Sequence, residues 1–183
     1  MDKKLGNKVA VVTGGSAGIG LGAAKRFAAE GAQVFLTGRR QSELDKAVAA
    51  IGSNATGIAG DASKLSDIDR IYKTVKDQAG RIDVLFVNAG FYEPGKLGEI
   101  SEEHFDKTSN TNVRGLLFAV QKALPILSRD SSVILVGSSA SIKGFEALSV
   151  YDASKATERS FSLGAGSPTL KSYQRAAGSP GQS

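Results

Sequence analysis

Short runs of aliphatic and β-branched residues alternate along the chain with longer segments in which apolar residues recur at helical spacing. This alternation is typical of βαβ units. The runs VAVV, VLFV and VILV are apolar at every position, which favours parallel strands covered by helices on both faces. The pattern predicts strands over residues 8–13, 32–37, 56–60, 82–88 and 132–137.

Glycines that end helices support the segments between these strands. We predict helices over residues 18–30, 42–51 and 64–78, which are followed by Gly31, Gly52 and Gly80. A longer helix is predicted to begin after Ser101, with Glu102 and Glu103 facing the helix dipole, and to run towards Leu127. Pro125 is expected to kink this helix near its end.

The last twenty residues differ from the rest of the chain. Residues 164–183 are rich in Gly, Ser and Pro, carry no acidic residue and show no apolar period. We therefore expect one incomplete domain over residues 1–163, whose last helix ends near Leu163, followed by a disordered tail over residues 164–183.

Composition excludes several classes of site. The chain has no cysteine, which rules out disulfides, thiolate zinc sites and a cysteine nucleophile, and suits the reducing cytoplasm. No metal site is predicted. No apolar run approaches the roughly 18 residues of a membrane helix, so neither a membrane span nor a signal peptide is expected. The net charge is +5, but the basic residues are scattered, so nucleic acid is not an expected partner.

The segment VAVVTGGSAGIG carries the first chemical signal. It ends a predicted strand, turns through Gly14, Gly15, Gly18 and Gly20, and opens a predicted helix. In that context, exposed backbone N–H groups and the positive helix end bind a dinucleotide pyrophosphate. The spacing is G-x-x-x-G-x-G, and a tight turn with close helix packing is the alternative interpretation.

The end of the second predicted strand indicates which dinucleotide would fit. Thr37 stands where NAD-binding sites place a carboxylate, and Arg39 and Arg40 follow it. A guanidinium binds phosphate through two parallel hydrogen bonds, which favours the 2′-phosphate of NADP (or NADPH) and makes NAD the less favoured cofactor. Two solvated arginines in a turn are the alternative.

Tyr151 and Lys155 form a Y-x-x-x-K pair, which places the phenol and the ammonium on one helix face. A nearby cation stabilises phenolate and lowers the tyrosine pKa from about 10 towards working pH. The tyrosine can then exchange a proton with an alcohol or a carbonyl. By itself the pair is also compatible with a purely structural role.

Together, these signals resemble the short-chain dehydrogenase/reductase family over residues 5–161. The resemblance rests on TGGSAGIG at residues 13–20, Asp61, Asn88-Ala89-Gly90, Asn112, Ser138, and Tyr151 with Lys155. It implies an α/β fold, a Rossmann-type doubly wound parallel sheet of strand order 3-2-1-4-5 with helices on both faces.

The resemblance also implies roles in hydride-transfer chemistry between a carbonyl and a secondary alcohol. Tyr151 is the expected general acid/base, and Lys155 lowers its pKa and holds the nicotinamide ribose. Ser138 is expected to bind the substrate oxygen, and Asn112 to hold a water that relays protons. Ser139 is expected to point away from Ser138 because strand neighbours alternate.

For the cofactor, the resemblance implies a set of binding residues along the strand ends. The expected contacts are phosphate and ribose at Gly14, Ser16, Gly18, Ile19 and Gly20, the 2′-phosphate at Arg39 and Arg40, adenine at Asp61, and the cofactor floor at Asn88, Ala89 and Gly90.

The chain departs from the family pattern after the tyrosine helix. Family members usually continue with a further strand, a mobile substrate loop and a final strand, so we expect a C-terminally truncated member whose fifth strand lies at the edge of the sheet. The leading hypothesis is an NADP(H)-dependent oxidoreductase acting on a small carbonyl or alcohol, with possible pairing of copies through the long helix. The alternatives are a module that binds NADPH without turnover and an unstable fragment.

Overall fold

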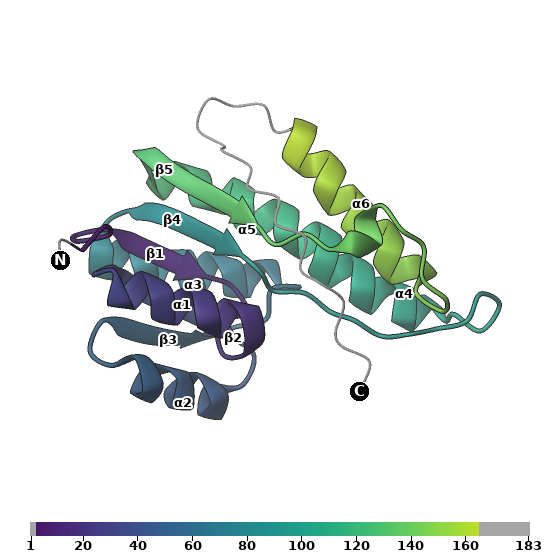
Figure 1. Ribbon diagram of the computed structural model, residues 1–183, viewed down its shortest axis with the longest axis horizontal. Coiled ribbons are helices and arrows are strands. Elements are labelled where there is room, and N and C mark those ends of the chain that lie inside the picture. The colour runs from purple at the N-terminus through teal and green to yellow at the C-terminus, as the bar shows by residue number, and fades with distance from the viewer. Residues whose placement is uncertain (1–2, 165–183) are drawn as a thin grey trace.

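A five-stranded parallel sheet organises the chain, and the computed structural model describes residues 3–164 of it (Figure 1). The strand order is β3-β2-β1-β4-β5, which confirms the predicted doubly wound topology. The strands are β1 (Val9–Val12), β2 (Gln33–Gly38), β3 (Ala55–Ala59), β4 (Ile82–Val87) and β5 (Leu127–Leu135). β1 and β4 are almost entirely buried, as their runs VAVV and VLFV predicted, whereas the run VILV at the end of β5 is buried only at Val133.

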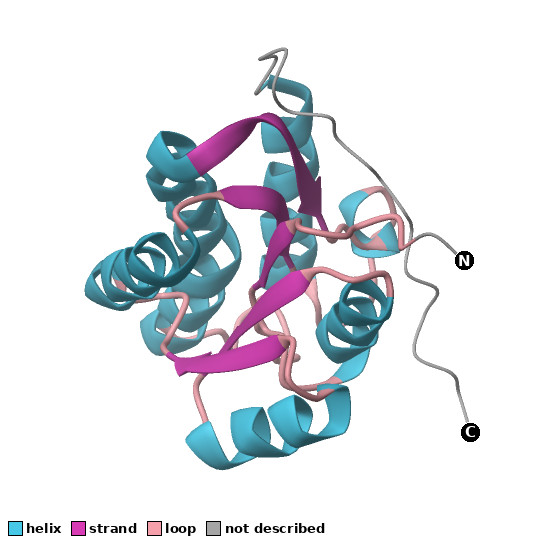
Figure 2. Ribbon diagram, turned by 90° about the vertical axis from the view of Figure 1, so that its left-hand side faces the viewer, coloured by secondary structure: helices cyan, strands magenta, loops and turns pink. Residues whose placement is uncertain are grey.

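Helices cover both faces of the sheet (Figure 2). On one face, α1 (Gly18–Ala29) and α2 (Gln41–Ile51) bury small residues and Leu44 against β1 and β2. On the other face, α3 (Leu65–Ala79) and α5 (Leu116–Ala123) bury a larger hydrophobic cluster that includes Phe35 and Leu85. The bounds of α1, α2 and α3 confirm the predicted helices to within one residue at each end.

The long helical segment after Ser101 starts as predicted but is not a single α-helix. The Ser101 side chain caps α4 (Glu102–Ser109) by accepting a hydrogen bond from the His104 N–H. A π-helix, η1 (Asn110–Gly115), then interrupts the α-helical hydrogen bonding before α5 begins. Pro125 lies in a 3₁₀ turn, η2 (Leu124–Ile126), so the segment ends in a tighter turn where a kink was expected.

β5 starts five residues earlier than predicted. After Leu127 its first residues, SRDSS, are polar, which hid the start of the strand from an analysis based on apolar runs. They pair with β4 from Ile82 and Leu127 onwards, and the register shifts before Val84 meets Ser132. Within residues 3–164, β5 is the terminal strand of the sheet, in line with the expected edge position.

After β5, a short 3₁₀ turn, η3 (Ser139–Ser141), leads to α6 (Ser149–Gly164). Residue 164, which was assigned to the tail, is the last residue of α6. The predicted disorder of the remaining tail, residues 165–183, lies outside the described residues. Among the helices described here, none has both the length and the apolar character that crossing a membrane requires.

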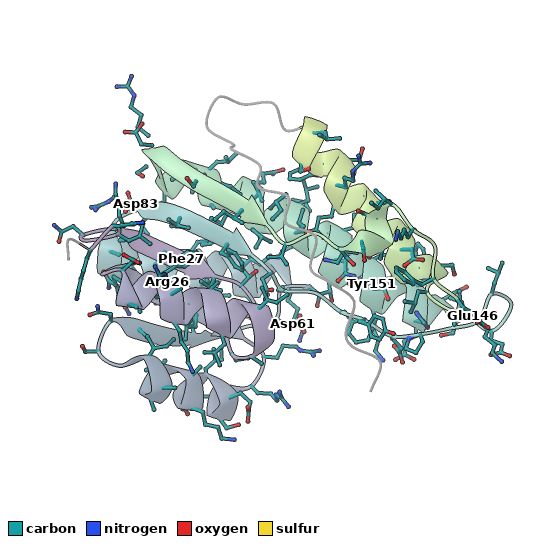
Figure 3. The ribbon with its side chains drawn as sticks, viewed as in Figure 1. Arg26, Phe27, Asp61, Asp83, Glu146 and Tyr151 are labelled. Atoms are coloured by element: carbon teal, nitrogen blue, oxygen red, sulfur yellow. The ribbon has the colours of Figure 1, made fainter. Side chains whose placement is uncertain are left out.

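Asp83 joins three segments at the amino ends of the strands, opposite the end where Asp61 lies (Figure 3). Its buried carboxylate accepts hydrogen bonds from the Val9 N–H at 2.9 Å, the Ser128 hydroxyl at 2.9 Å and Arg81 Nε at 3.0 Å. Burial acts to raise the pKa of Asp83, but these hydrogen bonds and the arginine charge together hold it below the ordinary value.

We expect Asp83→Asn to lower the free energy of unfolding by about 2 kcal/mol at neutral pH, because the amide cannot accept the same set of bonds. A lowered folded-state pKa stabilises the fold above the unfolded pKa of about 4, and that contribution disappears as the pH falls through the folded pKa. The difference between wild type and variant, measured by urea unfolding, should therefore shrink in acid. Asp77→Asn, which removes an exposed ion pair with Lys73, is the control and should cost less than about 1 kcal/mol. Equal losses in the two variants would contradict the assignment.

Candidate functional site

The loop between β1 and α1 is shaped by glycines. Gly14 and Gly18 have φ angles of 63° and 53°, in the left-handed region that favours glycine. A Cβ on Gly14 would lie 2.9 Å from Asn88 Nδ2, and a Cβ on Gly20 would overlap the carbonyl oxygen of Gly14. The missing side chains therefore let the start of α1 pack directly on the loop and keep the loop against the end of β4.

Thr13 and Asn88 hold this loop to the end of β4. Thr13 Oγ1 accepts hydrogen bonds from the N–H groups of Asn88 at 2.9 Å and Ala89 at 3.0 Å. Asn88 Nδ2 donates in return to the carbonyls of Thr13 at 3.2 Å and Gly14 at 3.0 Å. The two segments that leave the carboxyl ends of β1 and β4 are thus fixed to one another by side-chain bonds.

A cleft of about 300 Å³ opens at the carboxyl ends of the strands. Four of the residues that line it are glycines from four different strand ends, which leaves backbone exposed to a ligand. The lining residues are Gly14, Ser16, Ala17, Thr37, Gly38, Arg39, Arg40, Gly60, Asp61, Ala62, Asn88, Ala89, Gly90, Phe91 and Thr111.

Eight of the predicted cofactor residues line this cleft: Gly14, Ser16, Arg39, Arg40, Asp61, Asn88, Ala89 and Gly90. The other three, Gly18, Ile19 and Gly20, are not among its lining residues. Gly20 acts on the cleft indirectly, through the position of the Gly14 carbonyl, and the Ile19 side chain is exposed. Arg39 and Arg40 are both exposed. The Asp61 carboxylate accepts hydrogen bonds from the Ser63 N–H and hydroxyl, which fixes its orientation.

Tyr151 lies on α6, beyond the same end of the sheet as Asp61 (Figure 3), and Lys155 follows one turn later on the same helix. Lys155 Nζ is 5.9 Å from the centre of the Tyr151 ring. Gly90 connects this pair to the cleft, because a Cβ there would lie 3.9 Å from Lys155 Nζ and 3.6 Å from Asn112 Oδ1. The structure therefore brings Lys155 and Asn112 next to Gly90, which lines the cleft, although none of the four predicted catalytic residues is itself a lining residue.

The π-helix η1 carries Asn112, whose side chain is almost fully buried. Asn112 Nδ2 donates to the Phe91 carbonyl at 2.9 Å and to Ser154 Oγ at 2.9 Å, and Oδ1 accepts from the Phe91 N–H at 2.7 Å. Both amide protons are used in these bonds, which tie α6 to the segment after β4. The role in holding a water stays a prediction.

Ser138 lies just beyond β5 and begins the turn η3. Its Oγ accepts a 3.2 Å hydrogen bond from the Ala140 N–H, which uses a lone pair and leaves the hydroxyl proton out of that bond. The expectation that Ser138 and Ser139 alternate as strand neighbours is wrong, because both residues follow the end of β5 and Ser139 already belongs to η3.

Two side chains next to the Tyr151–Lys155 pair were missed by the sequence analysis. The Tyr92 ring meets the Tyr151 ring edge to face, with centres 5.2 Å apart, and its side chain is 59% exposed. Glu158 lies 2.6 Å from Lys155 Nζ and is 3% exposed. The i,i+3 spacing of Lys155 and Glu158 was a signal that could have identified the second contact, whereas nothing in the sequence pattern pointed to Tyr92.

Comparison with known proteins bears on the family. Residues 8–171 match the protein family described as short chain dehydrogenase. The chain belongs to this family. As a short-chain dehydrogenase, it is 46% identical over 159 residues to the oxidoreductase asL5 of Sarocladium schorii, and 35% identical over 156 residues to a galactitol 2-dehydrogenase of Agrobacterium fabrum. These alignments cover 86% and 84% of this chain, but the chain spans only 64% and 61% of the length of the two relatives.

Solved structures of short-chain dehydrogenases share the fold. A glucose/ribitol dehydrogenase from Brucella melitensis matches with a TM-score of 0.89 and 29% identity, over 95% of this chain and 74% of the other. A short-chain dehydrogenase from Burkholderia cenocepacia in complex with NADP matches with a TM-score of 0.85 and 33% identity, over 88% of this chain and 68% of the other.

We expect Gly20→Ala to lower the free energy of unfolding by about 1 to 3 kcal/mol, because the new methyl group overlaps the Gly14 carbonyl and separates α1 from the loop. Gly22→Ala is the matched control on the same helix, since a Cβ there meets no atom within 4 Å. It should stabilise the protein by about 0.5 to 1 kcal/mol through helix propensity. Urea unfolding measures both, and a Gly20→Ala variant as stable as Gly22→Ala would show that the close approach is not required.

Proposed function

We propose that this short-chain dehydrogenase is an NADP(H)-dependent oxidoreductase that interconverts a small-molecule carbonyl and a secondary alcohol. The observation that carries the proposal is the approach of Lys155, the partner of Tyr151, to Gly90, which lines the glycine-rich cleft. The nicotinamide cofactor would supply hydride transfer at carbon, a chemistry that no side chain of this protein provides.

The residues of the cleft fit a dinucleotide. Gly14, Gly38, Gly60 and Gly90 leave room for close approach to the backbone, and the start of α1 directs its positive end towards the loop. Gly14 would hold the diphosphate, and Asp61, whose orientation Ser63 fixes, would bind adenine. The glycines from four strand ends make the cleft suited to a long, anionic ligand.

The entrance of the cleft favours NADP over NAD. Arg39 and Arg40 follow the end of β2, line the cleft and are exposed to solvent. Their guanidinium groups could therefore bind a 2′-phosphate. Thr37, in the position where a carboxylate would accept ribose hydroxyls, is buried and carries no charge.

At the other end of the cleft, Tyr151 would exchange a proton with the substrate oxygen. The Lys155 ammonium, 5.9 Å from the centre of the phenol ring, would donate to the nicotinamide ribose. Ser138 would donate its hydroxyl proton to the same substrate oxygen, since its hydrogen bond with Ala140 uses only a lone pair. Asn112 would position this end by fixing Phe91 and Ser154, and its second Oδ1 lone pair would hold the proposed water.

A second function, binding of NADPH without turnover, is favoured by a different observation. The residues that line the cleft all lie between Gly14 and Thr111, whereas β5, which leads to Ser138, is paired on one side only within the described residues. Cofactor binding therefore depends on a better supported part of the fold than catalysis does. A cytoplasmic location and pairing of copies through the α4–α5 segment stay predictions from the sequence.

We expect Tyr151→Phe to lower kcat by about 100-fold to 10,000-fold, because the ring keeps its packing against Tyr92 but has no proton to transfer. The measurement is NADPH oxidation with a panel of ketones, followed by absorbance of the reduced nicotinamide. NADPH fluorescence serves as the control and should show unchanged affinity. Binding without turnover in the wild-type chain would reject the oxidoreductase and support the binding module.

We expect Arg39→Asp to weaken NADPH binding by about tenfold or more while leaving NADH binding nearly unchanged, because only NADPH carries the 2′-phosphate. Arg129→Asp makes the same change of charge at an exposed position of β5 that does not line the cleft, and should affect neither cofactor. Fluorescence titration gives the four dissociation constants. A parallel loss of both cofactors in Arg39→Asp would contradict the assignment.

A further inference from the structure

Lys155 also forms a buried ion pair with Glu158, a residue that has no part in the function proposed above. Glu158 Oε2 is 2.6 Å from Lys155 Nζ, and the two side chains are 3% and 10% exposed. The other ion pairs of the described residues each include at least one side chain that is more than a quarter exposed. This pair is therefore shielded from solvent on both sides.

The ion pair determines how many protons Lys155 can offer. An ammonium has three donors. One donates to Glu158 at 2.6 Å and a second donates to the Val136 carbonyl at 3.3 Å. The third is left for Tyr151 and for a ligand above Gly90. With two directions fixed by the protein, the third direction is fixed as well.

The ion pair also changes the charge that Tyr151 meets. A cation near a phenol favours the charged phenol form, whereas an ammonium paired with a carboxylate, as Lys155 is with Glu158, forms a nearly neutral unit. We propose that Glu158 is the positioning residue of Lys155: its carboxylate aims the ammonium and offsets its charge, so that Tyr151 gives up its proton less readily than Lys155 alone would dictate.

Among the charged side chains of the described residues, Glu158 is the one that contacts the Lys155 ammonium. On α6, Asp152 uses Oδ2 to accept a hydrogen bond from the Phe145 N–H, its Oδ1 is buried without a hydrogen-bond partner, and Arg159 is exposed. The titratable groups on the elements packed against α6 are exposed, except for the half-buried His104. They are Tyr92 at the Tyr151 ring, Arg114 on η1, Lys143 and Glu146 after η3, and Glu102, Glu103, His104, Asp106 and Lys107 on α4. Burial raises the pKa of Glu158, and the Lys155 ammonium opposes that rise.

The test is a titration of Tyr151 in the full chain without cofactor or substrate. Tyrosine labelled with ¹³C at Cζ gives one NMR signal for each of the four tyrosines, and the signal that disappears in Tyr151→Phe belongs to Tyr151. Burial raises the pKa of Tyr72 far above the range of the titration, which removes one source of overlap. In Glu158→Gln, which keeps the side-chain shape and removes the charge, we expect the Tyr151 midpoint to fall by about one pH unit.

Glu103→Gln is the matched control, because it removes the same charge from an exposed ion pair with Lys107 on the neighbouring helix α4. It should leave the Tyr151 midpoint unchanged. An unchanged or raised midpoint in Glu158→Gln, or an equal shift in Glu103→Gln, would overturn the proposal. If Glu158→Gln does not unfold cooperatively on heating, Glu158→Asp is the deciding variant, because it keeps the charge at a greater distance from Lys155. We then expect a smaller fall of the Tyr151 midpoint, and an unchanged midpoint would reject the proposal.

The importance of Glu158 for turnover rests on the proposed function, but the titration does not. A lowered Tyr151 midpoint in Glu158→Gln together with no turnover of any ketone would keep the positioning role and reject the oxidoreductase. Turnover in the wild-type chain together with an unchanged Tyr151 midpoint in Glu158→Gln would keep the oxidoreductase and reject the positioning role. Where turnover occurs, the pH profile of kcat for alcohol oxidation in Glu158→Gln should shift in the acid direction with the Tyr151 midpoint.

Discussion

The site depends on how closely the backbones leaving β1 and β4 approach one another. Strand pairing ends at Val12 and Phe86, and beyond that point Thr13 and Asn88 join the two segments through side-chain hydrogen bonds. These bonds are possible only because Gly14 has no side chain in the space that Asn88 occupies. The same contact leaves the loop backbone exposed to the cleft. The absence of a side chain at Gly14 therefore both joins the segments that follow β1 and β4 and creates the binding surface.

The sequence predicted those parts of the fold whose causes are local. Continuous apolar runs identify β1 and β4 because parallel strands covered on both faces must be apolar throughout. Glycines after Ile51 and Ala79 mark helix ends because both Gly52 and Gly80 adopt positive φ angles. The polar start of β5 escaped because an edge strand pairs on one side and tolerates charged residues such as Arg129. The π-helix around Asn112 is a change in hydrogen-bond register, which no residue pattern in the segment encodes.

The site shows the same division. Motif residues such as Ser16 and Asp61 line the cleft because the topology gathers the carboxyl ends of the strands. Gly20 belongs to the same motif but does not line the cleft; it shapes the loop by packing on the Gly14 carbonyl. The spacing of the glycines alone does not distinguish these two roles. Glu158 was missed for another reason: a lysine and a glutamate three residues apart on a helix usually form an exposed pair, whereas this one is buried on a helix that packs against α4, η1 and η3.

The path of β5 links the rim of the sheet to the reactive end of the cleft. Val136 continues from β5, donates its N–H to the Val87 carbonyl, and uses its own carbonyl to hold Lys155. Arg129, Asp130 and the shifted register discourage strand addition along the first half of β5, while Ser132–Leu135 pairs regularly with β4. The position of the lysine therefore depends on how firmly this second half of β5 is held, and within the described residues β4 is the strand that holds it.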